Sequence, residues 1–185
     1  MLFRSPLSSF AKITEITSEQ ESSITSILEE CGISDIKKIE HDEMLDGWNT
    51  QTEKGYRVTV ENINNVIIYI DNGILSEIRY ADNNLYKNGK MIEPLTNFTL
   101  TSTEKAQIEI NCKDYVKNTL VSPSTAKFAG YGNWDIHKSH GTIYVTSYVD
   151  AQNSFGAQIR NNFEIVINDN KVISYKLDGV EMLKQ

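Results

Sequence analysis

The sequence predicts an α+β protein made of two small units, each a helix followed by a meander of about four antiparallel strands. A helical apolar pattern occurs twice, at residues 18–31 and 101–120, and short strand patterns separated by turn signals follow each one. A helix packed on one face of such a sheet buries the apolar side of both elements. The predicted units span residues 12–97 and 101–185, and residues 94–101 between them are too poor in Gly and Ser for a flexible linker.

The composition supports a folded core. Of the 185 residues, 39% are hydrophobic and 23% charged, which is typical of globular domains and unlike disordered chains. The longest strongly apolar run, residues 66–70, is far shorter than the roughly 18 residues of a membrane helix. We therefore expect no membrane partner and a cytoplasmic location, or a secreted or surface-attached one if the N-terminus is processed or truncated. Cys31 and Cys112 fall on apolar helix faces, which predicts two buried thiols.

The first unit begins with a clear helix. Ser18 and Glu21 have the spacing of a capping box, and Gly32 is the expected stop. Apolar residues recur between them at helical spacing, namely Ile24, Ile27, Leu28 and Cys31. Residues 62–65 are predicted to be a turn, and Asn72-Gly73 and Asn88-Gly89 are hairpin signals. Strands are expected at 33–41, 56–60, 66–70, 75–81, 84–87 and 90–92.

The second unit repeats this order. Thr101 and Glu104 form another capping box, and Pro123 is expected to end the helix at Ser122. The helix stripe contains Ile108, Cys112, Tyr115, Val116 and Leu120. Strands are expected at 134–138, 142–150, 158–168 and 171–177.

The charge is unevenly distributed. Residues 1–100 hold 16 Asp/Glu and 9 Lys/Arg, whereas residues 101–185 hold nine of each. An acidic first half argues against a nucleic-acid partner, because phosphates require a basic patch. The acidic first half is compatible with a basic protein partner, although an acidic surface also increases solubility.

A motif in the second unit carries a family resemblance. It comprises SPSTAKF (residues 122–128), Trp134, YVDAQNSFGA (residues 148–157), Arg160 and Phe163. This pattern resembles a C-terminal module of Firmicutes proteins that include lipoproteins, zinc-ribbon-fronted proteins and phage or mobile-element products. The resemblance covers roughly residues 104–185. It implies a small α+β module similar in shape to cystatin-like or β-lactamase-inhibitor-like folds, and it implies no activity.

Two polar segments are the candidate interaction surface. In the 150–160 loop, Asp150 is expected to pair with Arg160, and Phe155 to fold back as an apolar plug. The 40–48 segment is read as a solvated loop, with a cation site or an acidic patch facing a partner as alternatives. Its successive side chains point to opposite faces and cannot all reach one ion. The candidate residues are Glu40, Asp42, Glu43, Asp46, Trp48, Asp150, Gln152, Asn153, Phe155 and Arg160.

Catalytic and cofactor motifs are missing from the sequence. It has no Gly-x-Ser-x-Gly elbow and no phosphate-binding glycine loop, and His137 and His140 are read as hairpin-tip residues without a third metal ligand. Trp48 and Trp134 are expected to anchor cores, while an exposed tryptophan would indicate a binding hot spot.

Three functional hypotheses follow. The first is a non-enzymatic protein-binding protein with no cofactor and an undetermined target and oligomeric state. The second, a sharper form of the first, is a mobile-element inhibitor whose acidic face occupies the basic groove of a host protein. The third is a small pocket-bearing ligand carrier or enzyme, because a curved sheet wrapped on a helix can enclose a cavity.

Overall fold

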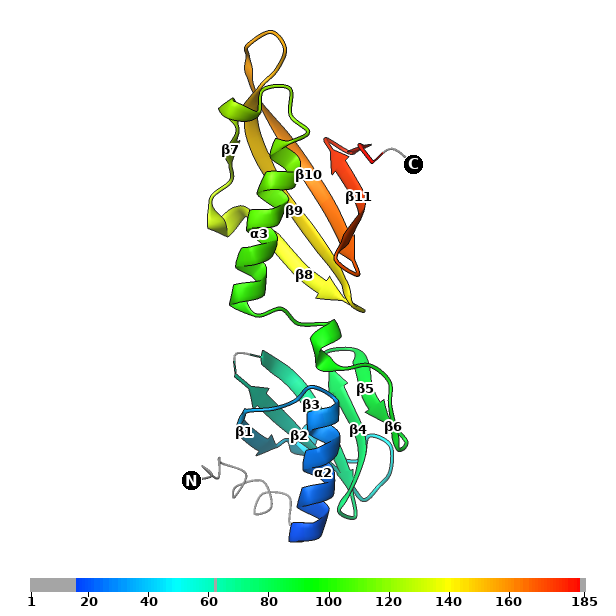
Figure 1. Cartoon of the computed structure of the whole chain (residues 1–185). Coiled ribbons are helices and arrows are strands. Elements are labelled where there is room, and N and C mark those ends of the chain that lie inside the picture. Colours follow the sequence, from blue (N-terminus) through cyan, green and yellow to red (C-terminus); the bar gives the residue numbers. More distant parts are fainter. Residues whose placement is uncertain (1–15, 62, 184–185) are drawn as a thin grey trace, which may run out of the picture. The chain divides into compact units, whose positions relative to one another are not determined.

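The computed structural model describes residues 16–61 and 63–183, and the chain divides into two compact units, Met1–Leu95 and Thr96–Gln185. Within the described residues, each unit contains one long helix and one antiparallel sheet of six strands (Figure 1). The predicted mixture of helix and antiparallel sheet is therefore confirmed. The predicted number of about four strands per unit is too low. The six strands of the first unit correspond to the six segments expected there, whereas the second unit also contains the two-residue strands Lys127–Phe128 and Val180–Glu181, which give too little pattern to detect in the sequence.

Helix α2 (Ser18–Glu30) opens the first unit. Its N-cap is Thr17, whose hydroxyl accepts from the Gln20 backbone N–H while the Gln20 side chain accepts from the Thr17 N–H. The capping box predicted one residue later, at Ser18 and Glu21, is therefore wrong: a Thr-x-x-Gln pair satisfies the same orphan N–H groups equally well. Past the helix end, Gly32 adopts φ 76°, as expected of a helix stop.

The first sheet is a meander in which sequence neighbours are also sheet neighbours. The sequence predicts a turn at residues 62–65. Residue 62 lies outside the described residues, and residues 63–65 belong to β3, which begins at Ile63 because its pairing with β2 extends past the apolar run. The Asn72-Gly73 and Asn88-Gly89 turns have positive φ at both residues, as this turn chemistry predicts. The strands are β1 (Ile36–His41), β2 (Glu53–Val60), β3 (Ile63–Asp71), β4 (Ile74–Tyr80), β5 (Asn83–Lys87) and β6 (Lys90–Met91).

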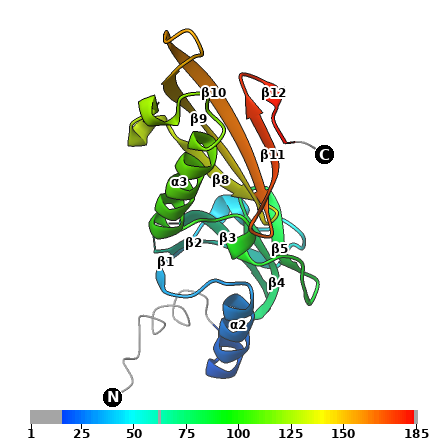
Figure 2. The same ribbon diagram turned by 45° about the horizontal axis from the view of Figure 1, so that its top comes forward.

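The register gives this sheet two distinct faces. Tyr56, Ile68 and Ile78 lie side by side on β2, β3 and β4 and are at most 2% exposed. They form the core beneath α2, which lies along this face (Figure 2). The neighbouring row points the other way and contains Gly55, Tyr69, Glu77 and Lys87. We call this second side the outer face.

Helix α3 (Ser102–Lys117) opens the second unit. Its N-cap Thr101 forms the predicted capping box with Glu104. The helix ends at Lys117, before the predicted stop at Ser122-Pro123, because Asn118 caps it and the Thr119 hydroxyl donates to the carbonyl of Val116. Leu120 still packs against the core from outside the helix.

The second sheet is built around two long strands, β9 (Thr142–Gln152) and β10 (Gln158–Asn168). On one side, β11 (Lys171–Leu177) and β12 (Val180–Glu181) extend the sheet from β10. On the other, β8 (Asp135–Ser139) and β7 (Lys127–Phe128) each pair with β9, toward its start and its end respectively. The predicted bounds of β10 and β11 are confirmed.

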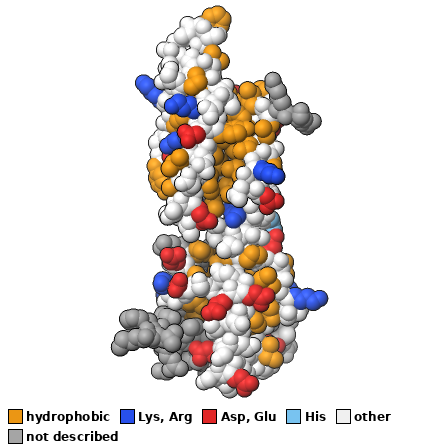
Figure 3. All heavy atoms as spheres, viewed as in Figure 1, with side chains coloured by type: hydrophobic (Ala, Val, Ile, Leu, Met, Phe, Trp, Pro, Cys, Tyr) orange, Lys and Arg blue, Asp and Glu red, His pale blue; other side chains and the backbone are white. Residues whose placement is uncertain are grey.

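The core of the second unit lies between α3 and one face of its sheet. Cys112 and Val116 of the helix pack with buried strand residues, and Trp134, Phe128 and Phe163 contact one another through their rings. Figure 3 shows apolar side chains on the part of the sheet beside α3. The half-buried residues that flank the core are, among others, Ile143, Ile167, Val172, Leu177 and Leu183.

Both cysteines are free and buried, as predicted. Burial raises the pKa of the Cys31 thiol to about 11, with help from Glu30, and that of Cys112 to about 12. Both thiols are therefore protonated and unreactive at neutral pH.

Candidate functional site

The hairpin tip between β9 and β10 is organised by a single side chain. The Oδ1 atom of Asn153 accepts hydrogen bonds from the backbone N–H groups of Phe155 and Ala157, each at 3.0 Å. The Asn153 N–H also donates to the carbonyl of Ala157 at 3.0 Å, and Gly156 adopts φ 80°. These bonds close the turn from within and constrain its backbone.

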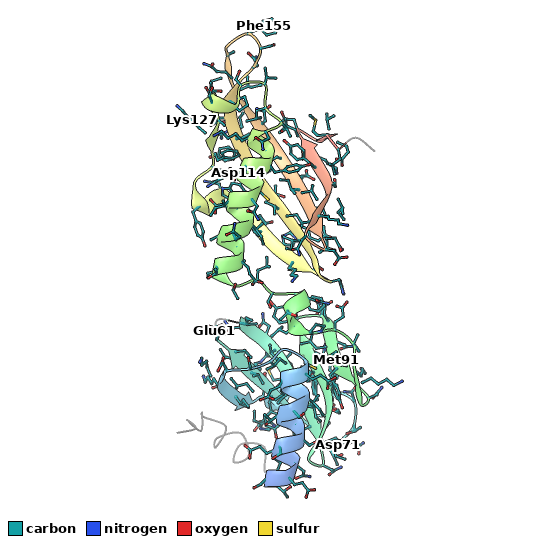
Figure 4. All side chains as sticks on the ribbon, viewed as in Figure 1. Glu61, Asp71, Met91, Asp114, Lys127 and Phe155 are labelled. Atoms are coloured by element: carbon teal, nitrogen blue, oxygen red, sulfur yellow. The ribbon has the colours of Figure 1, made fainter. Side chains whose placement is uncertain are left out.

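Phe155 stands at the end of this turn and is 93% exposed (Figure 4). The prediction that it folds back as a plug is therefore wrong. The Asn153 side chain already occupies the inside of the turn, so the phenyl ring points outward. An aromatic side chain left in water on an ordered turn is a candidate binding anchor.

The Asp150–Arg160 pair lies two residue pairs below Gln152–Gln158, the last pair before the turn, at directly opposed positions of β9 and β10. Arg160 donates from Nε and Nη2 to the two carboxylate oxygens of Asp150, at 2.8 and 2.9 Å, which confirms the predicted pairing. This hydrogen bonding lowers the pKa of Asp150 and raises that of Arg160. The guanidinium also lies 3.8 Å from the ring centroid of Tyr148, so charge pairing and a cation–π contact fix the hairpin base together.

The preceding loop is tied to the same hairpin. The Gln152 N–H donates to the Thr125 hydroxyl at 2.9 Å, and Lys127 pairs with Asp150 in the register of β7 and β9. Gln152 thus contributes a backbone hydrogen bond that joins the hairpin to the preceding loop. Ile159, at the start of β10, is 41% exposed and adds apolar surface below the tip.

In the first unit, the acidic residues of the 40–48 segment do not converge. Glu40 pairs with Lys38 at 2.7 Å, Asp42 accepts from Arg57 Nε at 2.6 Å, and Glu43 is exposed in a short 3₁₀ turn, Glu43–Leu45. Across the described residues, 16–61 and 63–183, no three His, Cys, Asp or Glu side chains are grouped to hold a metal ion. The segment is therefore fastened to its own strands by separate ion pairs.

Asp42 and Asp46 make the main contacts that hold the 40–48 segment on β1 and β2. The hydrogen bond from Arg57 holds the pKa of Asp42 below its ordinary value. Asp46 accepts from His41 Nε2 at 2.9 Å and from the Gly55 N–H at 3.0 Å. Burial alone would raise the pKa of Asp46, but these two donors leave it lowered.

Residues 42–52 fold back over the outer face of the first sheet. A Cβ atom on Gly55 would lie 2.2 Å from the Cβ of Leu45, so the loop can lie against β2 only because residue 55 is glycine. The Gly47 N–H donates to the carbonyl of Glu53 at 2.9 Å and holds the middle of the loop. We call residues 42–52 the covering loop.

Two buried carboxylates lie under the covering loop, and the sequence analysis missed both. Glu53 and Glu77 are each 1% exposed. Asn49 donates its backbone N–H to Glu53 Oε2 at 2.7 Å, and its side-chain amide to Glu53 and to Glu77 Oε2, the latter at 2.9 Å. Ser76 also donates to Glu53, while Lys87 Nζ lies 3.0 Å from Glu77 Oε2. In the sequence, Glu53 lies before the expected strand 56–60, and Glu77 lies within the expected strand 75–81 without any signal of its burial.

Trp48 lies on top of this cluster. Its ring stacks on Tyr69 with centroids 6.4 Å apart and planes at 22°, and the Arg79 guanidinium carbon lies 5.4 Å from its centroid. Tyr69 and Arg79 both belong to the outer face, so the indole lies on the sheet with its other side toward solvent, and Trp48 is 59% exposed. The prediction that it anchors a core is therefore wrong, whereas Trp134 does belong to a core.

Two open hollows bear on the pocket hypothesis. One, of about 260 Å³, lies beside α2 and is lined by Lys54, Tyr56 and Asn72 among others. The other, of about 390 Å³, lies beside Trp134, Asp135 and Tyr148 in the second unit. Neither contains any of the ten residues predicted as the interaction surface.

Comparisons with protein-family models, curated proteins and solved structures found no match for this chain. The Firmicutes-module resemblance of residues 104–185 therefore stays a prediction. Among the described residues, no helix is both long and apolar enough to cross a bilayer.

Proposed function

We propose that this protein is a non-enzymatic binding protein that docks onto a protein partner through the β9–β10 hairpin tip. The observation that carries the proposal is the 93% exposure of Phe155 on a turn that Asn153 closes from within. The single helix on one face of an antiparallel sheet also supports the cystatin-like or β-lactamase-inhibitor-like shape as part of this proposal.

A pre-organised aromatic tip suits a binding role for a thermodynamic reason. Association costs free energy for every loop and side chain that must be ordered at the interface, and a tip that is already ordered avoids much of that cost. A phenyl ring transferred from water into a partner pocket contributes a large apolar area. The paired Asp150 and Arg160 add no net charge, so the partner surface expected at the tip is an apolar pocket.

Site-specific photo-crosslinking in the native host tests this proposal. Benzoylphenylalanine at position 155 keeps an aromatic ring at the tip, and the same residue at position 173 serves as the control, because Ile173 is also exposed in the second unit, at 57%. We expect one crosslinked partner from position 155 and none from position 173. The purified partner should bind Phe155→Ala about tenfold or more weakly than the unmodified chain. Identical products at both positions, or full affinity of Phe155→Ala, would contradict the proposal.

A further inference from the structure

The first unit presents a second aromatic anchor, independent of the hairpin tip. Trp48 and Met44 are carried by the covering loop and are 59% and 93% exposed. Trp, Met and Arg are the residue types most enriched in protein interfaces, and Arg79 lies against the indole. We call Glu43, Met44 and Trp48 the Trp48 surface.

The Trp48 surface is held rigidly from below. The residue next to Trp48, Asn49, is bonded to the two buried carboxylates of Glu53 and Glu77, and Leu45 is seated against Gly55. Buried carboxylates are tolerated only when hydrogen bonds or ion pairs compensate them, so the loop position and the cluster depend on each other. The indole is therefore fixed in its orientation before any partner arrives.

The charge of this unit indicates what kind of partner fits. Residues 16–95 contain 15 Asp/Glu against 7 Lys/Arg, which leaves an excess of eight negative charges. Residues 40–52 contain four carboxylates and no Lys or Arg, although Glu40 and Asp42 are paired with Lys38 and Arg57. Glu43 of the Trp48 surface is exposed. Opposite charges at the rim of an interface steer association and select the partner.

We propose that the Trp48 surface binds a basic peptide segment of a partner protein. An apolar side chain of the segment packs on the open side of the indole, and its Lys or Arg residues face Glu43 and the excess negative charge of the first unit. This site uses none of the residues of the hairpin tip, so the proposal for it is independent of the proposed function and can be tested separately.

Parallel peptide selection tests the proposal without a known partner. A phage library of random nine-residue peptides is panned on the full-length protein and, side by side, on Trp48→Ala. We expect the peptides lost on Trp48→Ala to be rich in Lys and Arg around an apolar residue. Ile74→Ala, which removes another exposed side chain of the same unit (70% exposed), should retain the peptides, as should Phe155→Ala.

Fluorine NMR on protein labelled with 5-fluorotryptophan gives the second readout. The protein has two tryptophans, so the resonance of Trp134, in the other unit, is an internal control. A selected peptide should shift the Trp48 resonance and leave that of Trp134 unchanged, and Trp48→Ala should weaken its binding about tenfold or more. Added salt should also weaken the binding, because exposed charges are screened.

Several outcomes would overturn the proposal. Selected peptides that are neutral or acidic would contradict the partner chemistry, and the absence of any peptide that distinguishes the protein from Trp48→Ala would contradict the site. A Trp48 shift produced by neutral oligosaccharides but by no basic peptide would show that the indole stacks on sugars. Circular dichroism of each variant establishes that it is folded before its binding is compared.

Discussion

The side-chain amide of Asn49 donates to the buried carboxylate of Glu77, 28 residues further along the chain, at 2.9 Å. Asn49 lies in the covering loop and Glu77 in β4, so this bond joins the loop to the middle of the sheet. The same amide also reaches Glu53. One side chain therefore compensates two buried acids.

Asn49→Ala should destabilise the protein markedly. A buried group left without its hydrogen bond costs about 1–3 kcal/mol, and two carboxylates lose the Asn49 amide, so we expect a loss of about 2–4 kcal/mol in the free energy of unfolding. Urea denaturation followed by tryptophan fluorescence measures it. The control is Asn64→Ala, an exposed asparagine of β3, which should change stability by no more than about 0.5 kcal/mol. Equal effects of the two substitutions would show that the cluster does not hold the loop.

Gly55→Ala should displace the covering loop. The new methyl group would lie 2.2 Å from the Leu45 Cβ, and crowding of this kind costs about 1–3 kcal/mol. Leu45→Ala removes the outer atoms of the side chain but keeps the Cβ that the new methyl group meets, so it should relieve the crowding only in part. In a double-mutant cycle, the coupling energy between Gly55→Ala and Leu45→Ala should therefore be smaller than the destabilisation caused by Gly55→Ala alone. Gly132→Ala, where a Cβ meets nothing within 4 Å, is the matched control and should be nearly neutral.

Asn153→Ala should loosen the hairpin tip while the second unit stays folded. The backbone N–H groups of Phe155 and Ala157 lose their acceptor, and both can then bond to water, so we expect a loss of only about 0.5–1.5 kcal/mol. Amide hydrogen exchange should become faster at Ala157, with little change at Val149 in the core of β9. Unchanged exchange at Ala157 would show that the tip is ordered by something other than the Asn153 side chain.

Glu181 should remain ionised at about pH 3, where an ordinary glutamate is mostly protonated. Its carboxylate accepts from the Ser174 hydroxyl and from the N–H groups of Tyr175 and Leu183, which lowers its pKa to about 2. A lowered pKa means that these bonds stabilise the fold above the ordinary glutamate range of about 4.3 and lose that effect as pH falls toward 2. Carboxyl carbon NMR titration measures the pKa, and Ser174→Ala should raise it. A pKa in the ordinary range would contradict the hydrogen bonding seen at β12.

Much of the architecture could be predicted because its signals are local. The Thr101–Glu104 capping box, the Asn-Gly hairpins and the bounds of β10 and β11 follow from residues within a few positions of one another. The Asp150–Arg160 pair could be predicted because the two residues flank one short turn. The end of α3 was placed too late because Leu120 continues the apolar spacing beyond the point where Asn118 caps the helix.

The candidate surfaces themselves depended on contacts between distant parts of the chain. The sequence by itself determined two helices, two antiparallel sheets, and an acidic first half, because periodicity, turn chemistry and composition are properties of short segments. Only the tertiary structure decided that Glu53 and Glu77 are buried and that Trp48 is half exposed, because the covering loop crosses the outer face and lies against Gly55. It also decided that Phe155 points outward, since Asn153 bonds the inside of the turn. Pairings across 28 residues leave no period or spacing in the sequence, so packing alone reveals them.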